Sequence, residues 1–167
     1  LAIGYNALGG SIAGGEYNVA IGNYVLDANT SGDYNVAVGY NALTANTTGS
    51  YNTASGSNSL SSNTTGDANT TFGNYSLYAN TTGNYNTASG HQSLYYNTEG
   101  DWNTASGFYS LNKNTTGNSN MASGSYSLRN NTTGTRNIAV GYGALDAPDT
   151  ENDNLAIGYD ALGGSIA

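Results

Sequence analysis

Residues 35–49 read Asn-Val-Ala-Val-Gly-Tyr-Asn-Ala-Leu-Thr-Ala-Asn-Thr-Thr-Gly, and residues 52–66 keep the same frame as Asn-Thr-Ala-Ser-Gly-Ser-Asn-Ser-Leu-Ser-Ser-Asn-Thr-Thr-Gly. The two stretches begin 17 residues apart, at 35 and 52. The first glycine of the frame recurs at this step along the chain, at Gly22, Gly39, Gly56, Gly73, Gly90, Gly107, Gly124, Gly141 and Gly158. A fixed period of this length is the sequence signature of a repeat protein, in which each unit packs on its neighbours.

Other positions of the unit are equally constant. They include the leucines and asparagines Leu43, Leu60, Leu77, Asn35, Asn52 and Asn69. Residues 1–13 return as residues 155–167 with one difference, Asn6 against Asp160, which indicates that the segment belongs to a longer array. We therefore expect residues 1–167 to form a single repeat domain of about ten coils, a fragment of a longer fibre protein.

Seventeen residues are too few for a helix, a strand and their connections, so the unit predicts an all-β parallel solenoid, a β-roll. We expect one strand in the Asn-x-Ala-x-Gly run and a second around the leucine. Asn-Thr-Thr-Gly predicts a turn in which Asn bonds the backbone two residues on and Gly supplies a positive φ. Stacked coils would align identical residues in ladders, and aligned asparagines can exchange amide hydrogen bonds.

The residues that flank the strand alanine change together, whereas the Ala, the Gly and the Leu stay almost fixed, with Thr71 in the alanine place of the fifth coil. Since neighbouring strand residues face opposite sides, we expect Ala, Gly and Leu inside and the flanking residues outside. In the outer coils the flanking residues are apolar, namely Val19, Ile21, Val36, Val38, Ile138, Val140, Leu155 and Ile157. Exposed apolar strips of this size are unusual on a monomer, so we predict that they form the interface of a homotrimer.

Charge excludes several classes of partner. Only 8% of residues are charged, and 3 Lys and Arg stand against 11 Asp and Glu, for a net charge of −8. Nucleic acid and anionic lipid both require a basic face, so neither is an expected partner. No stretch approaches the roughly 20 apolar residues of a membrane helix, and we expect no membrane insertion by this segment.

The sequence offers no set of residues for catalysis, a cofactor or a metal. Its one histidine, His91, follows a strand glycine, where we expect an exposed loop or strand residue, and the chain has no cysteine. The unit lacks a phosphate-binding glycine motif. Four carboxylates gather in one turn, at Asp146, Asp149, Glu151 and Asp153, but without the glycine-rich pattern of calcium-binding rolls. We expect a solvated acidic turn and a protein that is not an enzyme.

Three further sets of residues are candidates for binding or modification. Aromatic residues precede the ladder asparagine at Tyr17, Tyr34, Tyr51, Tyr85 and Trp102. We expect them to stack between coils, and the alternative is glycan contact through Tyr51, Tyr85 and Trp102. A threonine row raises ice binding, at Thr30, Thr47, Thr64, Thr81, Thr98, Thr115 and Thr132, but these residues belong to the turns. Asn-x-Ser/Thr sequons occur at Asn29, Asn46, Asn63, Asn69, Asn74, Asn80, Asn114, Asn130 and Asn131.

The repeats at 18–22, 35–43, 137–145 and 154–162 resemble the head repeats of YadA-type trimeric autotransporter adhesins. They are also similar to the Gly-Tyr-x-Ala-Leu…Asn-Thr-Thr-Gly arrays of phage tail-fibre proteins. The resemblance implies a left-handed, trimeric β-roll on a cell surface or virion, used as a spacer or an adhesive head.

Together these patterns predict a structural or adhesive rod, the shaft or head of an extracellular fibre. Its expected partners are further copies of itself and a cell-surface glycan or protein receptor. The alternatives are a non-trimeric extracellular filament, a glycan-binding array of aromatic ladders and, least favoured, an ice-binding surface.

Overall fold

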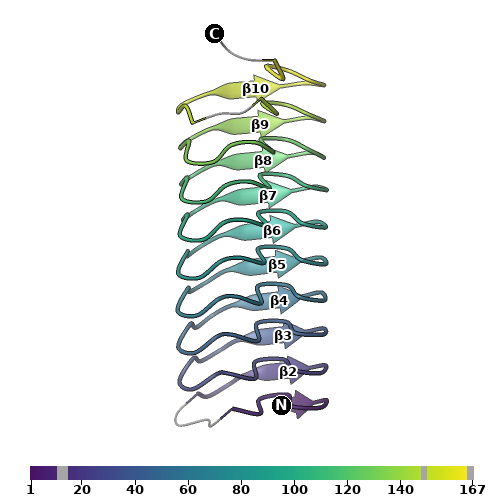
Figure 1. The fold of residues 1–167 in the computed structure, drawn as a ribbon, viewed down its shortest axis with the longest axis vertical. Coiled ribbons are helices and arrows are strands. Elements are labelled where there is room, and N and C mark those ends of the chain that lie inside the picture. The colour runs from purple at the N-terminus through teal and green to yellow at the C-terminus, as the bar shows by residue number, and fades with distance from the viewer. Residues whose placement is uncertain (11–14, 148–149, 165–167) are drawn as a thin grey trace.

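The structure is a computed structural model that describes residues 1–10, 15–147 and 150–164, and it is an all-β parallel solenoid. Ten strands form one sheet in sequence order (Figure 1). The strands are β1 (Ala2–Ile3), β2 (Val19–Ile21), β3 (Val36–Val38), β4 (Thr53–Ser55), β5 (Thr70–Phe72), β6 (Thr87–Ser89), β7 (Thr104–Ser106), β8 (Met121–Ser123), β9 (Ile138–Val140) and β10 (Leu155–Ile157). The predicted fold class is confirmed.

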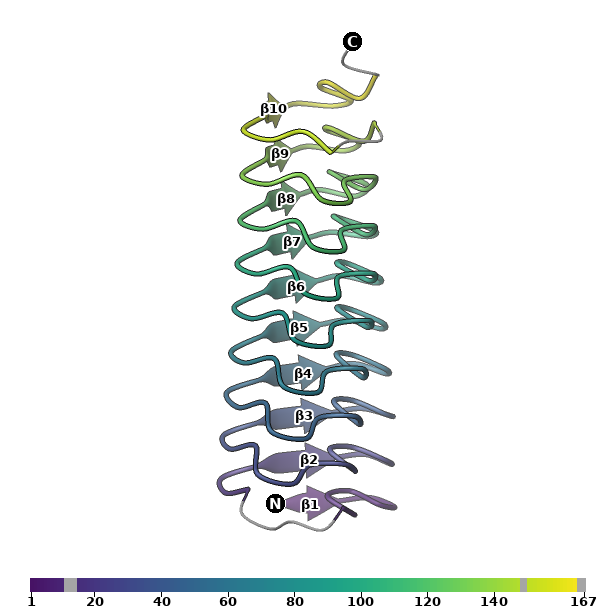
Figure 2. The ribbon, with the colours of Figure 1, turned by 60° about the vertical axis from the view of Figure 1, so that its left-hand side comes forward.

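The register of the sheet follows the period of the sequence. Ala37 pairs with Ala54, 17 residues later (54 − 37). Ala2 pairs with Ala20 across a first coil that holds one more residue. Each coil therefore follows the path of the coil before it, as the turned view in Figure 2 shows. Within the described residues, no helix is long and apolar enough to cross a membrane.

The interior of each coil is narrow and is filled by two ladders. From the second coil to the ninth, the strand alanines such as Ala37 and Ala88 are fully buried, and so are the ladder leucines such as Leu60 and Leu94. The residues on either side of each alanine are exposed or half-buried. This confirms the predicted division between inside and outside, which follows from the alternation of side chains along a strand.

The predicted second strand around the leucine is wrong, because among the described residues each coil has one strand and the leucine segment is a turn. Leu43 has a φ of 53° and Asn41 a φ of 54°, both in the left-handed region. A strand needs negative φ throughout, so these residues interrupt it. Backbone pairing between coils nevertheless continues, since the Leu43 N–H donates to the Ser59 carbonyl over 3.0 Å.

The left-handed positions explain why Val, Ile and Thr are missing from three places in each regular coil. Three residues of each regular coil adopt them: the one before the ladder Asn, the second after the strand Gly, and the ladder Leu. None of the residues found there is Val, Ile or Thr. Branching at Cβ makes the left-handed conformation especially costly, which explains the absence of these residue types from the three positions.

The turn prediction was correct in place but wrong in mechanism. The Asn46 side chain donates to the carbonyl of Gly49, three residues on rather than two, over 2.9 Å. Gly49 and its equivalents do not have positive φ. They are glycines because a Cβ on Gly49 would collide with the Gly66 carbonyl of the next coil and with Asn46 Oδ1. Close packing of successive turns, and not a special backbone angle, requires glycine here.

Two columns of buried asparagine hold the turns together. In the turn column, Asn63 Nδ2 donates to Asn46 Oδ1 over 2.8 Å, which confirms the predicted amide exchange between coils. In the strand column, Asn52 Oδ1 accepts from the Asn69 backbone N–H over 2.9 Å. Both columns meet at one atom in each coil, because Asn52 Nδ2 and Asn63 Nδ2 donate to the Gly66 carbonyl. Buried amides are stabilising only when their hydrogen bonds are made, and among the described column asparagines the exception is Asn131 Oδ1, which has no partner at the end of the turn column.

The fifth strand replaces the interior alanine by Thr71, which is fully buried. Its hydroxyl forms a hydrogen bond with the buried Ser59 hydroxyl, and Ser59 also contacts the Ser76 hydroxyl over 3.1 Å. Serines that occupy the place before the ladder leucine in the middle coils thus supply the polar partner that a buried hydroxyl requires.

Candidate functional site

The first exposed surface is the outer side of the sheet, which we call the strand face. It consists of the outward residues of β1–β10, and the apolar members predicted as an interface all belong to it. Of these, Val36, Val38, Ile138, Leu155 and Ile157 are exposed, while Val19, Ile21 and Val140 are half-buried. The middle of the face carries hydroxyl residues, but Phe72 and Met121 are exposed there too. Apolar side chains are therefore spread over the length of the face.

The second surface is the row before the ladder asparagine, which we call the Tyr17 row. Tyr17 stacks on Tyr34 with ring centroids 4.8 Å apart, and Tyr34 stacks on Tyr51 at 5.2 Å. Tyr85 stacks on Trp102 at 5.6 Å with the rings 3° from parallel. The predicted stacking between coils is confirmed. The predicted glycan contact through Tyr51, Tyr85 and Trp102 stays a prediction.

The Tyr17 row is broken at Ala68, which has the same left-handed conformation as the aromatic residues, with φ 56°. Tyr51 lies on one side of the break and is 62% exposed, whereas Tyr34, stacked on both faces, is 47% exposed. One face of Tyr51 therefore has no ring against it at the break.

Replacing Ala68 with Tyr is expected to complete the stack and to raise the free energy of unfolding by about 1–2 kcal/mol, the contribution of two ring pairs. Urea denaturation measures the change. Ala68→Leu is the matched control, since it adds apolar area without a flat ring. A gain as large for Leu as for Tyr would show that area and not stacking is responsible.

The threonine row lies in the turns, as predicted, and its hydroxyls are engaged. Thr47 Oγ1 donates to the Thr64 carbonyl over 2.9 Å, and Thr64 Oγ1 donates to the Thr81 carbonyl over 3.0 Å. The same bond recurs in the other coils up to Thr115. These hydroxyl protons therefore point along the rod axis and not toward solvent.

The acidic turn lies partly outside the described residues, because Asp149 is not among them. The Arg136 guanidinium donates to both carboxylate oxygens of Asp153 over 2.6 and 2.8 Å, and this hydrogen bonding holds the pKa of Asp153 below its usual range. Burial raises the pKa of Asp146. In the described ranges, no three His, Asp or Glu side chains lie together as a metal site would require.

His91 is half-buried and packs among rings. It stacks on Phe108 at 5.6 Å and meets the edge of Tyr109 at 5.9 Å. These contacts assign it a packing role at the exit of strand β6.

Most sequon asparagines belong to the two buried columns. Asn29, Asn46, Asn63, Asn69, Asn80, Asn114 and Asn131 are fully buried, whereas Asn74 is exposed and Asn130 is half-buried. A glycan on a column asparagine would remove its amide from the ladder, and Asn130 Nδ2 donates to the Asp146 carbonyl, so Asn74 is the sequon asparagine that lies exposed.

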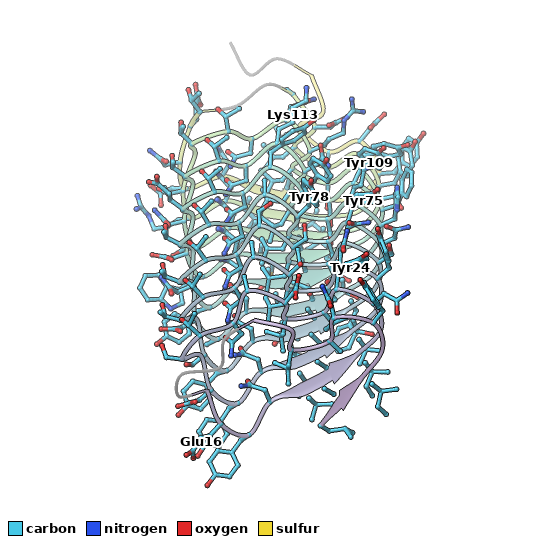
Figure 3. All side chains as sticks on the ribbon, turned by 60° about the horizontal axis from the view of Figure 1, so that its bottom comes forward. Glu16, Tyr24, Tyr75, Tyr78, Tyr109 and Lys113 are labelled. Atoms are coloured by element: carbon cyan, nitrogen blue, oxygen red, sulfur yellow. The ribbon has the colours of Figure 1, made fainter. Side chains whose placement is uncertain are left out.

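A third surface was not anticipated from the sequence. We call it the tyrosine cluster, and it consists of Tyr75, Tyr78, Tyr95, Tyr96 and Tyr109. Tyr78 stacks on Tyr95 at 5.0 Å, and Tyr96 meets the edge of Tyr95 at 4.6 Å. Burial is the main cause that raises the pKa of Tyr95, and the surrounding tyrosines raise it further. Figure 3 shows Tyr75, Tyr78 and Tyr109 on one side of the molecule together with Lys113, with Glu16 on the other.

The signal for this cluster was present but weak. Its members follow the ladder leucine or the strand glycine at positions where most coils carry other residues, so the period does not mark them out. Only the stacking of coils brings them together.

The comparisons with known proteins assign no family to this fold and no role to these surfaces. No family model, no curated protein and no solved structure matches the chain. What the architecture defines is the class: a β-solenoid repeat protein with one strand in each coil.

Proposed function

We propose that this chain is a structural and adhesive rod, the shaft or head of a surface-exposed fibre, and that it does not act as an enzyme. The observation that carries the proposal is the continuous hydrogen bonding along the axis. Backbone pairing joins the strands of successive described coils, and the strand asparagine column runs from Asn18 to Asn154. The turn asparagine column adds bonds from Asn29 to Asn131, and the threonine row adds bonds from Thr30 to Thr132. Such one-dimensional stacking gives stiffness and length, the properties that a spacer needs.

We further propose that the fibre is a homotrimer joined through the strand face. Exposed Val36 and Val38 on β3 and exposed Ile138 on β9 would lie against solvent in a monomer. Burying apolar area contributes roughly 25 cal/mol per Å², so a closed trimer that covers the face on all three chains is favoured. The resemblance to trimeric adhesin heads and tail-fibre arrays agrees with this assembly and with an extracellular location, on a cell or a virion.

The oligomeric mass tests this assembly. Light scattering coupled to size exclusion should give three times the chain mass of 17.1 kDa. The double variant Val36→Lys/Val38→Lys places charges in the interface and should run as a monomer, because two buried unpaired ammonium groups per chain are very costly. Thr48→Lys/Thr65→Lys, on exposed turn positions, is the matched control and should remain trimeric. A monomeric parent protein at tens of micromolar would refute the trimer, and small-angle scattering of that monomer would still report whether it is a rod.

A further inference from the structure

Two cationic residues, Lys113 and Arg129, follow the tyrosine cluster along the chain. Tyr78, Tyr95 and Arg129 occupy the position directly after the ladder leucine, in coils five, six and eight, and Tyr96 and Lys113 occupy the next position in coils six and seven. The Tyr96 N–H donates to the Asn112 carbonyl and the Lys113 N–H to the Arg129 carbonyl, each over 3.0 Å. Rings and cations therefore follow one another on adjacent coils, at steps of about 4.8 Å.

These cations stand out in an acidic chain. The protein has only 3 Lys and Arg, and one of them, Arg136, is paired with Asp153. In the described part of the chain, neither Lys113 nor Arg129 lies within ion-pair distance of a carboxylate. Arg129 instead lies over the Tyr126 ring, 5.4 Å from its centroid.

One carboxylate faces both cations at longer range. Asp146 follows Arg129 by one coil in the same row, and both Arg129 and Lys113 act on its charge. Asn130 Nδ2 donates to Asp146 Oδ1 over 3.2 Å, which holds the carboxylate beside the pair. An anion that binds the cations would feel the repulsion of Asp146, so this residue gives a sensitive test of the charge of the ligand.

The rings supply the other half of a recognition surface. Tyr96 is 51% exposed, and it rests edge-on against Tyr95, which fixes its orientation. Tyrosine offers an apolar face and a hydroxyl, a combination suited to the C–H faces and hydroxyls of a pyranose ring. The cations are suited to a carboxylate or sulfate carried by an adjoining sugar.

We propose that the tyrosine cluster, Lys113 and Arg129 together form a binding site for an anionic glycan, with pyranose rings on the tyrosines and acidic groups on the cations. Nucleic acid also combines rings with anions, but it carries a charge at every nucleotide and is repelled by a rod of net charge −8. Two cations suit a ligand with sparse charges. The site lies on turns and not on the strand face, so it rests on the proposed function only in requiring a solvent-exposed rod.

The test uses the 167-residue protein and isothermal titration calorimetry at low ionic strength. The probe is an oligosaccharide of alternating neutral sugars and uronates, with its carboxyl-reduced form as the neutral counterpart. The uronate form should bind, and the reduced form should bind at least about tenfold more weakly. Lys113→Ala and Arg129→Ala should each weaken binding about fivefold, and Tyr96→Ala about tenfold.

Three further variants complete the design. Asp146→Asn should tighten binding severalfold by removing the repulsion, whereas Arg136→Ala and Thr48→Ala, both outside the site, should leave the dissociation constant unchanged. The proposal is overturned if the uronate does not bind, if the reduced form binds equally well, or if an oligothymidylate binds more tightly through the same residues. Light scattering on each variant reports the trimer separately, so a failure of the site and a failure of the proposed assembly give different results.

Discussion

Gly107→Ala is expected to lower the free energy of unfolding by about 3–5 kcal/mol. Gly107 leaves strand β7 with a φ of 136°. A Cβ there would stand 2.5 Å from the Gly124 carbonyl oxygen and 2.6 Å from its carbon. Because both contacts are backbone, relief requires the coils to separate, which weakens the Gly124 N–H bond to the Ser106 carbonyl. Urea denaturation followed by circular dichroism measures the loss.

Gly158→Ala in the same 167-residue chain is the control for this substitution. Gly158 has nearly the same φ, 130°, but the nearest heavy atom to an added Cβ is Ala161 Cβ at 3.8 Å. Its loss should therefore be only the backbone strain, about 1–2 kcal/mol. Equal losses at the two positions would mean that the backbone angle, and not the approach of the next coil, demands glycine.

Asn86→Ala is expected to cost about 2–4 kcal/mol, because it leaves the buried Asn103 N–H without an acceptor and removes one of the two donors to the Gly100 carbonyl. Asn86 Oδ1 accepts from the Asn103 backbone N–H over 2.9 Å, and Asn86 Nδ2 donates to the Gly100 carbonyl over 2.8 Å. Both groups are buried and cannot turn to water when the amide is removed. Thermal and urea denaturation measure the effect.

Asn74→Ala provides the comparison, since Asn74 is an exposed asparagine just after strand β5. Its replacement should change stability by less than about 0.5 kcal/mol, as is usual for a surface position. If Asn86→Ala lowered the free energy of unfolding as little as Asn74→Ala, the asparagine columns would not stabilise the fold.

The features that follow from the 17-residue period were predictable from the sequence, whereas the local backbone conformations were not. The 17-residue step determined the strand register, and the invariance of Ala and Leu identified the interior. The left-handed φ of Leu43 was not predictable, because leucine does not favour that conformation. The role of the turn glycines was misread for a related reason: the collision that excludes a side chain at Gly49 involves Gly66 of another coil.

The candidate surfaces divide in the same way. The strand face and the Tyr17 row repeat with the period, and both were found from it. Tyr78, Tyr96 and Lys113 occur at positions that vary from coil to coil, and their proximity arises from stacking alone. Such a site is found only by comparing residues of adjacent coils that lie side by side, because residues within one unit do not reveal it.

The convergence of two asparagines on one glycine carbonyl, seen at Gly66, has a consequence for how such a molecule can grow. All the donors and acceptors of this junction come from one coil and its immediate neighbours, and the coils that contain Gly32 through Gly134 present the same set. Duplicating or removing a whole unit therefore leaves every junction intact and changes only the reach of the molecule, by about 4.8 Å. An insertion of another length keeps like residues paired only when a turn accommodates it, as in the first coil, and it does not lengthen the rod. Selection for a longer or shorter reach therefore acts in whole turns.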